Sequence, residues 1–122
     1  MARILIAEDE EAIREFLRRG LALRGHDVAA VGDGLAALEA LRQKSFDLLI
    51  TDIVMPLMDG LELSLAAARD YPALRIILMT GYAAERQRAH NLDALVHDVV
   101  SKPFSLDQMA AAVTKALAPP AR

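Results

Sequence analysis

The sequence predicts an α/β protein with a parallel five-stranded sheet and helices on both faces, and three observations support this prediction. Short apolar runs alternate with longer segments of helical period along the chain. The apolar runs lack a strict alternation of apolar and polar residues, which is typical of strands buried on both faces. The connections are short, and right-handed crossovers between parallel strands then place helices on both sides of the sheet.

Five segments are expected to be strands, because each is a short run rich in apolar residues with a polar, charged or glycine-containing end. They are residues 3–9, 27–31, 47–52, 75–81 and 98–103.

Four of the intervening segments place apolar residues at helical spacing. These residues are Ile13, Phe16, Leu17 and Leu21 in the first, Leu35, Leu38 and Leu41 in the second, Leu61, Leu65 and Ala68 in the third, and Leu106, Met109, Val113 and Leu117 in the last. Gly25 is placed to end the first helix and Pro72 follows the third, while Ser105 and Gln108 have the spacing of a capping box. Residues 84–95 have little apolar face, which indicates a helix that shifts or binds something else.

Length and composition exclude several classes of protein. The 122 residues fit one domain over residues 1–122 with its core at about 3–118, and if they are the whole product no output domain is attached. The net charge of −3 argues against a nucleic-acid-binding surface. The absence of cysteine excludes disulfides and thiolate metal sites. No apolar run is long enough for a signal peptide or a membrane span, so a cytoplasmic protein without membrane contact is expected.

Polar side chains occur where the predicted strands end: Glu8 and Asp9, Asp52, Thr80, and Lys102. Ligands of open α/β sheets bind beyond the carboxyl ends of the strands, so these side chains are expected at one edge. Carboxylates so close repel one another, and without a cation at least one pKa is expected to rise. Mg²⁺ relieves such repulsion and keeps coordination positions for water and phosphate, which predicts a phosphate-handling site.

The same residues fit phosphoryl transfer. Asp52 follows a mostly apolar strand at the centre of the pattern, which makes it the candidate nucleophile and the site of an aspartyl phosphate. Glu8 and Asp9 are candidate metal ligands, directly or through water. The transition state spreads negative charge over three oxygens, and Lys102 and Thr80 are available to stabilise it. Acids that are simply solvated at strand ends are the plain alternative, but that alternative does not explain the accompanying hydroxyl and lysine.

Four motifs carry a resemblance to a known family: "AEDE" (7–10), "TDIVMPLMDG" (51–60), "MTGY" (79–82) and "SKPF" (101–104). In this order and at these separations, they resemble the CheY-like receiver domain of two-component response regulators over about residues 3–118. The resemblance implies the strand order 2-1-3-4-5, a histidine kinase or histidine phosphotransfer protein as donor, and phosphorylation-controlled binding of a protein partner. It also implies a protein that catalyses only its own phosphorylation and dephosphorylation.

The resemblance further implies a role for each site residue. Mg²⁺ is expected to bind Asp9, Asp52 and the backbone carbonyl of Val54, with Glu8 acting through water. Thr80 and Lys102 are expected to contact the phosphoryl group, and the Lys102–Pro103 peptide is expected to be cis.

Two departures from the family pattern concern the switch, that is, the residues expected to change conformation on phosphorylation. Many receivers carry an aromatic residue on the fifth strand where this chain has Val99, so Tyr82 is expected to act with Thr80 as the switch. Val54 and Tyr82 flank the expected path of attacking water, and the Val54 side chain cannot orient one, which predicts slow self-dephosphorylation. Among variants the sequence most resembles single-domain regulators of the CpdR kind. This resemblance adds a protease complex to the candidate partners. The oligomeric state stays open between a monomer and a weak homodimer.

Three alternatives remain open from the sequence. An aspartate-nucleophile phosphatase typically has a second acid two residues after the nucleophile, where this chain has Val54. A flavin-binding domain of the same topology needs a phosphate-binding loop after the first strand, where this chain has the acidic, glycine-free "AEDEEA". A receiver from the N-terminus of a longer transcriptional regulator is the third.

Overall fold

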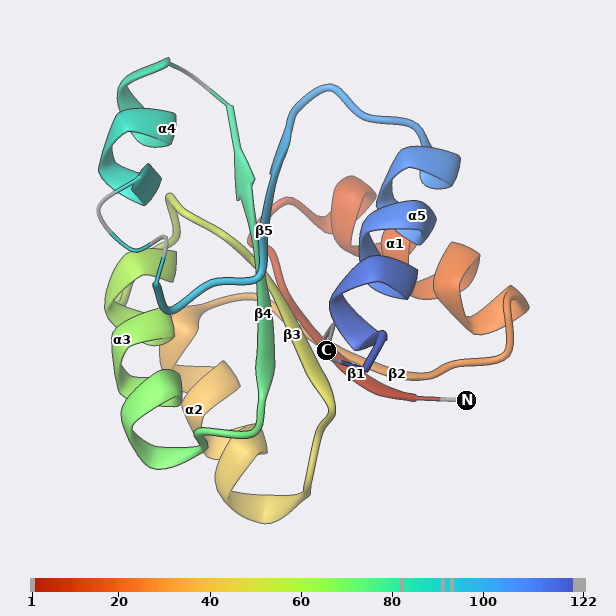
Figure 1. Cartoon of the computed structure of the whole chain (residues 1–122), viewed down its shortest axis with the longest axis horizontal. Helices are drawn as coiled ribbons and strands as arrows, with labels where there is room; N and C mark the ends of the chain where they lie inside the picture. The colour runs from red at the N-terminus through yellow and green to blue at the C-terminus, as the bar shows by residue number, and fades with distance from the viewer. Residues whose placement is uncertain (1, 82, 91, 93, 120–122) are drawn as a thin grey trace.

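The computed structural model describes residues 2–81, 83–90, 92 and 94–119, and within these ranges five parallel strands form one sheet (Figure 1). The strands are β1 (Arg3–Ala7), β2 (Asp27–Val31), β3 (Leu48–Asp52), β4 (Arg75–Thr80) and β5 (Asp98–Ser101). Their order is β2-β1-β3-β4-β5, which confirms both the predicted fold class and the predicted strand order. The first, fourth and fifth strands end one or two residues earlier than predicted, because the polar residues that follow them turn into the connecting loops.

Helices cover both faces of the sheet. They are α1 (Glu11–Leu23), α2 (Gly34–Gln43), α3 (Gly60–Asp70), α4 (Ala83–His90) and α5 (Leu106–Leu117). Figure 1 shows α1 and α5 on one face and α2, α3 and α4 on the other.

The central strand β3 is buried along its whole length and contributes to the core on both sides. Leu48 and Ile50 pack in the cluster that α1 and α5 cover, whereas Leu49 packs in the cluster that α2 and α3 cover. Alternate residues of a strand point to opposite faces, so a strand covered on both sides needs apolar residues at every position. This is the physical reason for the absence of alternation in the sequence.

The predicted apolar face of α5 is confirmed, since Met109 and Val113 are buried, and so is its capping box. The predicted face of α3 is wrong in part: Leu65 is exposed, and the buried residues include Leu63 and Ala67. Leucine and alanine occur all around α3, so the sequence offers more than one apolar stripe and the packing against the sheet selects one.

Other residues of the predicted helix faces also lie nearer the surface than expected. Leu35 of α2 and Phe16 of α1 are exposed, while Ala37 and Leu17 are buried on the same helices.

The fourth helix is the shortest of the five that the described residues form, and it ends at His90 rather than at the predicted residue 95. Ala89 packs against Ile53 and Leu78, while the only other buried residue in the described part of α4 is Glu85. Such a small apolar contact attaches the helix weakly to the sheet. No helix in the described part of the chain is long and apolar enough to cross a membrane.

Candidate functional site

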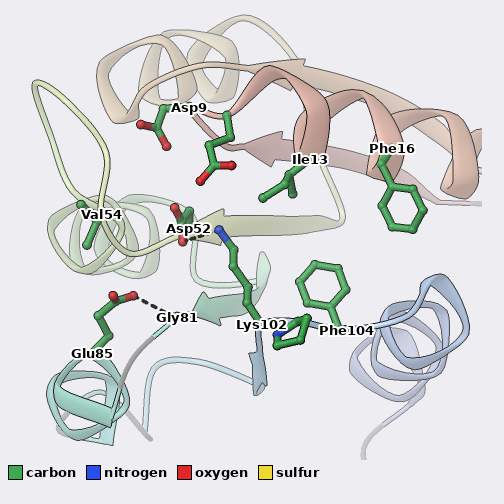
Figure 2. A pocket seen from close by; sticks show the side chains of 11 residues that line it. Asp9, Ile13, Phe16, Asp52, Val54, Gly81, Glu85, Lys102 and Phe104 are labelled. Carbon is green, nitrogen blue, oxygen red and sulfur yellow. Dashed lines mark hydrogen bonds and ion pairs between the residues drawn. The ribbon is translucent and has the colours of Figure 1, made fainter.

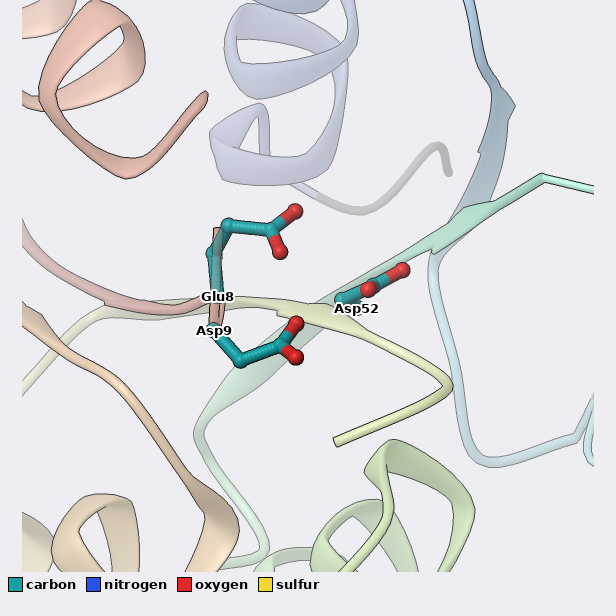
Figure 3. A group of neighbouring side chains, drawn as sticks. All are labelled: Glu8, Asp9 and Asp52. Atoms are coloured by element: carbon teal, nitrogen blue, oxygen red, sulfur yellow. The ribbon is translucent and has the colours of Figure 1, made fainter. Parts of the chain in front are cut away.

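Three carboxylates meet at the carboxyl edge of the sheet (Figure 3). Glu8 and Asp9 follow β1, and Asp52 is the last residue of β3. The strands β1 and β3 are paired in parallel with Ala7 opposite Thr51, so both chains leave the sheet at the same level. As a result, one carboxylate oxygen of each of the three residues lies within 4.8 Å of those of the other two.

Lys102 joins two of these carboxylates. Its Nζ donates a hydrogen bond to Oε1 of Glu8 at 2.9 Å and lies 3.3 Å from Oδ1 of Asp52. The lysine comes directly after β5, and its backbone N–H donates to the carbonyl of Thr80, which continues the pairing of β4 and β5 beyond the sheet. The Lys102–Pro103 peptide is cis.

Burial dominates the electrostatics of the site. It raises the pKa of Asp52, and the nearby charge of Asp9 adds to this rise, while the ammonium of Lys102 opposes it. Burial likewise raises the pKa of Glu8 against the hydrogen bond from Lys102. The sequence predicts this direction from mutual repulsion alone, but the larger cause is the loss of water around fully or nearly fully buried carboxylates.

The pKa of Lys102 is also raised, but for the opposite reason, because its neighbours outweigh burial. Burial acts to lower the pKa of Lys102, but the hydrogen bond to Glu8 and the charges of Asp52 and Glu8 outweigh it, so the pKa is raised. The raised pKa favours the charged ammonium form of Lys102, which faces the nucleophile candidate.

Thr80 ends β4 and is almost completely buried, with 1% of its surface exposed. Its Oγ1 has no hydrogen-bond partner among the described residues. A buried hydroxyl without a partner costs free energy, so such a group in a site indicates a ligand that completes it. Tyr82, the other predicted switch residue, lies outside the described residues.

The loop after β3 approaches the end of that strand closely. The Gly60 N–H donates to the carbonyl of Ile53 at 2.7 Å, and a Cβ on Gly60 would overlap the backbone oxygen of Asp52. A glycine is therefore required where α3 begins. The side chain of Asp59 caps this helix by accepting from the Glu62 N–H, so the loop has a fixed path.

A cavity of about 560 Å³, with an acidic end and an apolar end, opens beside Asp52 (Figure 2). Asp9, Asp52 and Lys102 lie at the acidic end, together with the exposed side chain of Val54. The apolar part is lined by Ile13, Phe16, Pro103 and Phe104. The cavity thus combines charged groups suited to a phosphate with an apolar surface suited to a larger molecule that carries it.

The donor set at the acidic end fits a hard divalent cation. Asp9 and Asp52 offer carboxylate oxygens close together, and Asp9 is exposed to water that could complete a coordination sphere. Glu8 is fully buried and already bound to Lys102, which favours the indirect role that the family resemblance implies for it. Val54, whose backbone carbonyl is the fourth predicted ligand, borders the same cavity.

The structure therefore brings together Glu8, Asp9, Asp52 and Lys102, with Thr80 at the end of the neighbouring strand. Gly60 and Glu85 were not assigned to the site from the sequence. Gly60 lies in a quoted motif, and its position just after a helix-capping aspartate was the available signal. Glu85 lies in a segment with no apolar pattern, and no sequence signal places it in the cavity.

Comparison with known proteins identifies relatives whose similarity extends over most of the chain. A family model described as the response regulator receiver domain matches residues 4–114. The response regulator receiver protein CpdR of Brucella abortus (strain 2308) is 40% identical over 117 residues, which cover 96% of this chain and 98% of that protein. The response regulator MprA of Mycobacterium leprae is 36% identical over 111 residues, but the chain spans only about half of its length, 49%.

Solved structures agree with the sequence relatives. The response regulator TrrA of Thermotoga maritima in complex with Mg(2+)-BeF has a TM-score of 0.87 and 32% identity, covering 96% of this chain and 100% of that one. A CheY-like receiver domain protein of Methanospirillum hungatei JF-1 has a TM-score of 0.89 and 27% identity, covering 96% of this chain and 94% of that one.

Proposed function

The chain belongs to the response regulator receiver domain family, and on that premise we propose that Asp52 is its Mg²⁺-dependent phosphoryl acceptor. The donor is a phosphohistidine on a histidine kinase or a histidine phosphotransfer protein, and the phosphorylated form changes its binding to a protein partner. The observation that carries this proposal is the ammonium of Lys102 between two buried carboxylates, with Asp9 beside them.

The geometry supports an in-line displacement. An oxygen of Asp52 attacks the phosphorus, so that a P–O bond forms and the P–N bond to the donor imidazole breaks. The electron pair of the broken bond goes to the imidazole nitrogen, which takes up a proton from solvent. Asp52 must be ionised for this attack, and the neighbouring ammonium favours the ionised form.

The other residues stabilise charge on the transferred group. Lys102 is positioned to bind one phosphoryl oxygen, and the unpaired hydroxyl of Thr80 is available to donate to another. Mg²⁺, held by Asp9 and Asp52 with the backbone carbonyl of Val54, supplies further positive charge when it is bound. The similarity to TrrA, whose structure contains Mg(2+)-BeF, supports this choice of cation.

A single phosphoryl group is expected to shift the conformation only in part. Moving a two-state equilibrium from 1:99 to 99:1 requires about 5.5 kcal/mol. A charge-assisted hydrogen bond contributes about 1.5–3 kcal/mol, so the two donors Lys102 and Thr80 together contribute about 3–6 kcal/mol, and most of that range lies below the requirement. We therefore expect the partner protein to complete the shift, and the resemblance to the CpdR kind supplies a protease complex as a candidate partner.

Phosphorylation with a small-molecule donor tests the proposal. Acetyl phosphate with Mg²⁺ is expected to add one phosphoryl group to the wild-type protein, measured by intact mass. Asp52→Asn is expected to take up none, because the amide is not a nucleophile. Full labelling of Asp52→Asn, or an unlabelled wild-type protein in the presence of a receiver that is labelled under the same conditions, would refute it. The wild-type protein is expected to show no turnover of phosphoesters in a steady-state assay.

A further inference from the structure

Glu85 brings a further carboxylate, from α4, to the cavity that Asp9, Glu10 and Asp52 also line. It is on α4, only 9% of its surface is exposed, and it lines the same cavity as Asp52 (Figure 2). Its Oε1 accepts a hydrogen bond from the backbone N–H of Gly81 at 3.0 Å. Nothing in the proposed phosphoryl transfer uses this residue.

The Gly81 N–H, which donates to Glu85, lies close to Asp52, the proposed phosphoryl acceptor. Gly81 directly follows Thr80, the last residue of β4, and β4 is paired in parallel with β3, with Met79 opposite Asp52. The Gly81 N–H and the Thr80 hydroxyl therefore lie at the end of the strand next to Asp52. Of these two donors, the hydroxyl is unpaired among the described residues, and the N–H is bound to Glu85.

We propose that the carboxylate of Glu85 holds the position that a phosphoryl oxygen requires, so that phosphorylation of Asp52 and the Glu85–Gly81 contact exclude each other. This inference rests on the proposed function, because it concerns the same acceptor. Glu85 is a positioning residue: through the Gly81 N–H it sets how readily the free form takes up a phosphoryl group.

The charges of the cavity give the physical reason for the competition. Asp9, Glu10, Asp52 and Glu85 line it, and among the described residues Lys102 is the one lysine or arginine that does so. A phosphoryl group carries about −1.5 to −2 charges at neutral pH, and both it and the carboxylate seek the same N–H donor. Two anions in a partly buried space repel strongly, so the side chain of Glu85, which is not covalently fixed in the site, is displaced from the Gly81 N–H.

Displacement of Glu85 acts directly on α4. The described contacts of this helix include the Gly81–Glu85 hydrogen bond, the packing of Ala89, and an ion pair of Arg88 with Asp59 at 3.1 Å. Asp59 also caps α3, so this ion pair links α4 to the loop that follows the acceptor. Loss of the first contact is expected to release the N-terminal end of α4 while Arg88 and Ala89 retain its C-terminal half.

The test compares Glu85→Gln with Glu10→Gln. The first keeps an amide oxygen that can accept from Gly81 but removes the charge, and the second removes one charge from the same cavity and leaves the Gly81 contact intact. Initial rates of phosphorylation by acetyl phosphate with Mg²⁺ are measured by separating both forms on a phosphate-affinity gel. Glu85→Gln is expected to react about fivefold faster than wild type, a ratio that corresponds to roughly 1 kcal/mol, and Glu10→Gln less than twofold faster.

A second measurement follows the contact itself in the wild-type protein. Beryllofluoride with Mg²⁺ is expected to shift the Gly81 amide resonance and to speed hydrogen exchange in the first turn of α4. Equal rate gains in the two variants, or an unchanged first turn of α4 with beryllofluoride bound, would overturn the inference even though phosphorylation itself proceeds. A wild-type protein that is not labelled at all would instead overturn the proposed function, and this inference with it.

Discussion

Lys102 and Glu8 are 94 residues apart in the sequence, and their side chains form an ion pair of 2.9 Å in which the carboxylate is fully buried. The same ammonium also faces Asp52 at 3.3 Å. One ammonium therefore pairs with two carboxylates that the sheet brings together, which ties the stability of the site to the residue proposed to bind the phosphoryl group.

Lys102→Met is expected to weaken both folding and phosphorylation. It leaves Glu8 buried without its counter-ion, and removal of one partner of a buried ion pair typically costs about 3–5 kcal/mol. Protonation of Glu8 lowers this cost, so the deficit is expected to shrink as the pH falls. Urea unfolding at pH 5 and pH 8 measures it. Lys102→Arg retains the charge and is the matched control; equal stability of the methionine variant and wild type at pH 8 would contradict the prediction.

The raised pKa values of Asp52 and Glu8 predict how stability depends on pH without Mg²⁺. Each group binds its proton more tightly in the folded than in the unfolded protein, so their contribution to stability is lost as the pH rises from the unfolded pKa through the folded pKa. Asp52→Asn is therefore expected to raise the Tm at pH 8 by a few degrees, since about 1 kcal/mol corresponds to roughly 4 °C in a domain of this size. At low pH, where Asp52 is protonated, the difference is expected to vanish.

Glu62→Gln is the control for this comparison, because Glu62 is an exposed residue in the first turn of α3 and outside the cavity. A Tm of Asp52→Asn below that of wild type at pH 8 would show that the pair with Lys102 outweighs burial.

Mg²⁺ is expected to stabilise the protein in proportion to the logarithm of its concentration. A ligand that binds only the folded state adds about 2.7 kcal/mol at 100 times its Kd. The cation also relieves the repulsion among Glu8, Asp9 and Asp52, so the Tm is expected to change less with pH when Mg²⁺ is present. Thermal unfolding across a Mg²⁺ titration measures both effects.

Asp9→Asn is expected to abolish most of this stabilisation while it retains the fold, because Asp9 is exposed and has no ion pair among the described residues. A Mg²⁺-dependent Tm shift as large as that of wild type would remove Asp9 from the set of proposed ligands.

The lifetime of the phosphoryl group is expected to be long and to shorten in Val54→Asn. Val54 is 56% exposed and lines the cavity beside Asp52, and its side chain offers no group that orients water. An asparagine amide at this position can bind an attacking water, so hydrolysis is expected to become several times faster. Decay of the label after removal of acetyl phosphate measures this. Leu57→Asn, an exposed position of the same loop outside the cavity lining, is the control; identical lifetimes of wild type and Val54→Asn would contradict the expectation.

The sequence alone determined the parallel sheet and the edge at which the charged residues meet, while the strand order followed from the resemblance to the receiver family. Apolar runs such as Leu48–Asp52 without alternation can be buried only between two layers of helices, and parallel strands end at a common edge. The positions of Asp9, Asp52 and Lys102 at strand ends therefore followed from local pattern together with the family motifs.

Only the tertiary structure decided which charged side chains of the site contact one another and which backbone groups they bind. The ion pair of Lys102 with Glu8 and the contact of Glu85 with Gly81 depend on side-chain directions across four different elements or loops, and no periodicity in the chain encodes these. The same holds for the face of α3, where several apolar stripes were available and packing on the sheet buried Leu63 instead of Leu65. Local sequence specifies the path of the backbone, but the pairing of buried charges depends on distances that exist only once the strands have assembled.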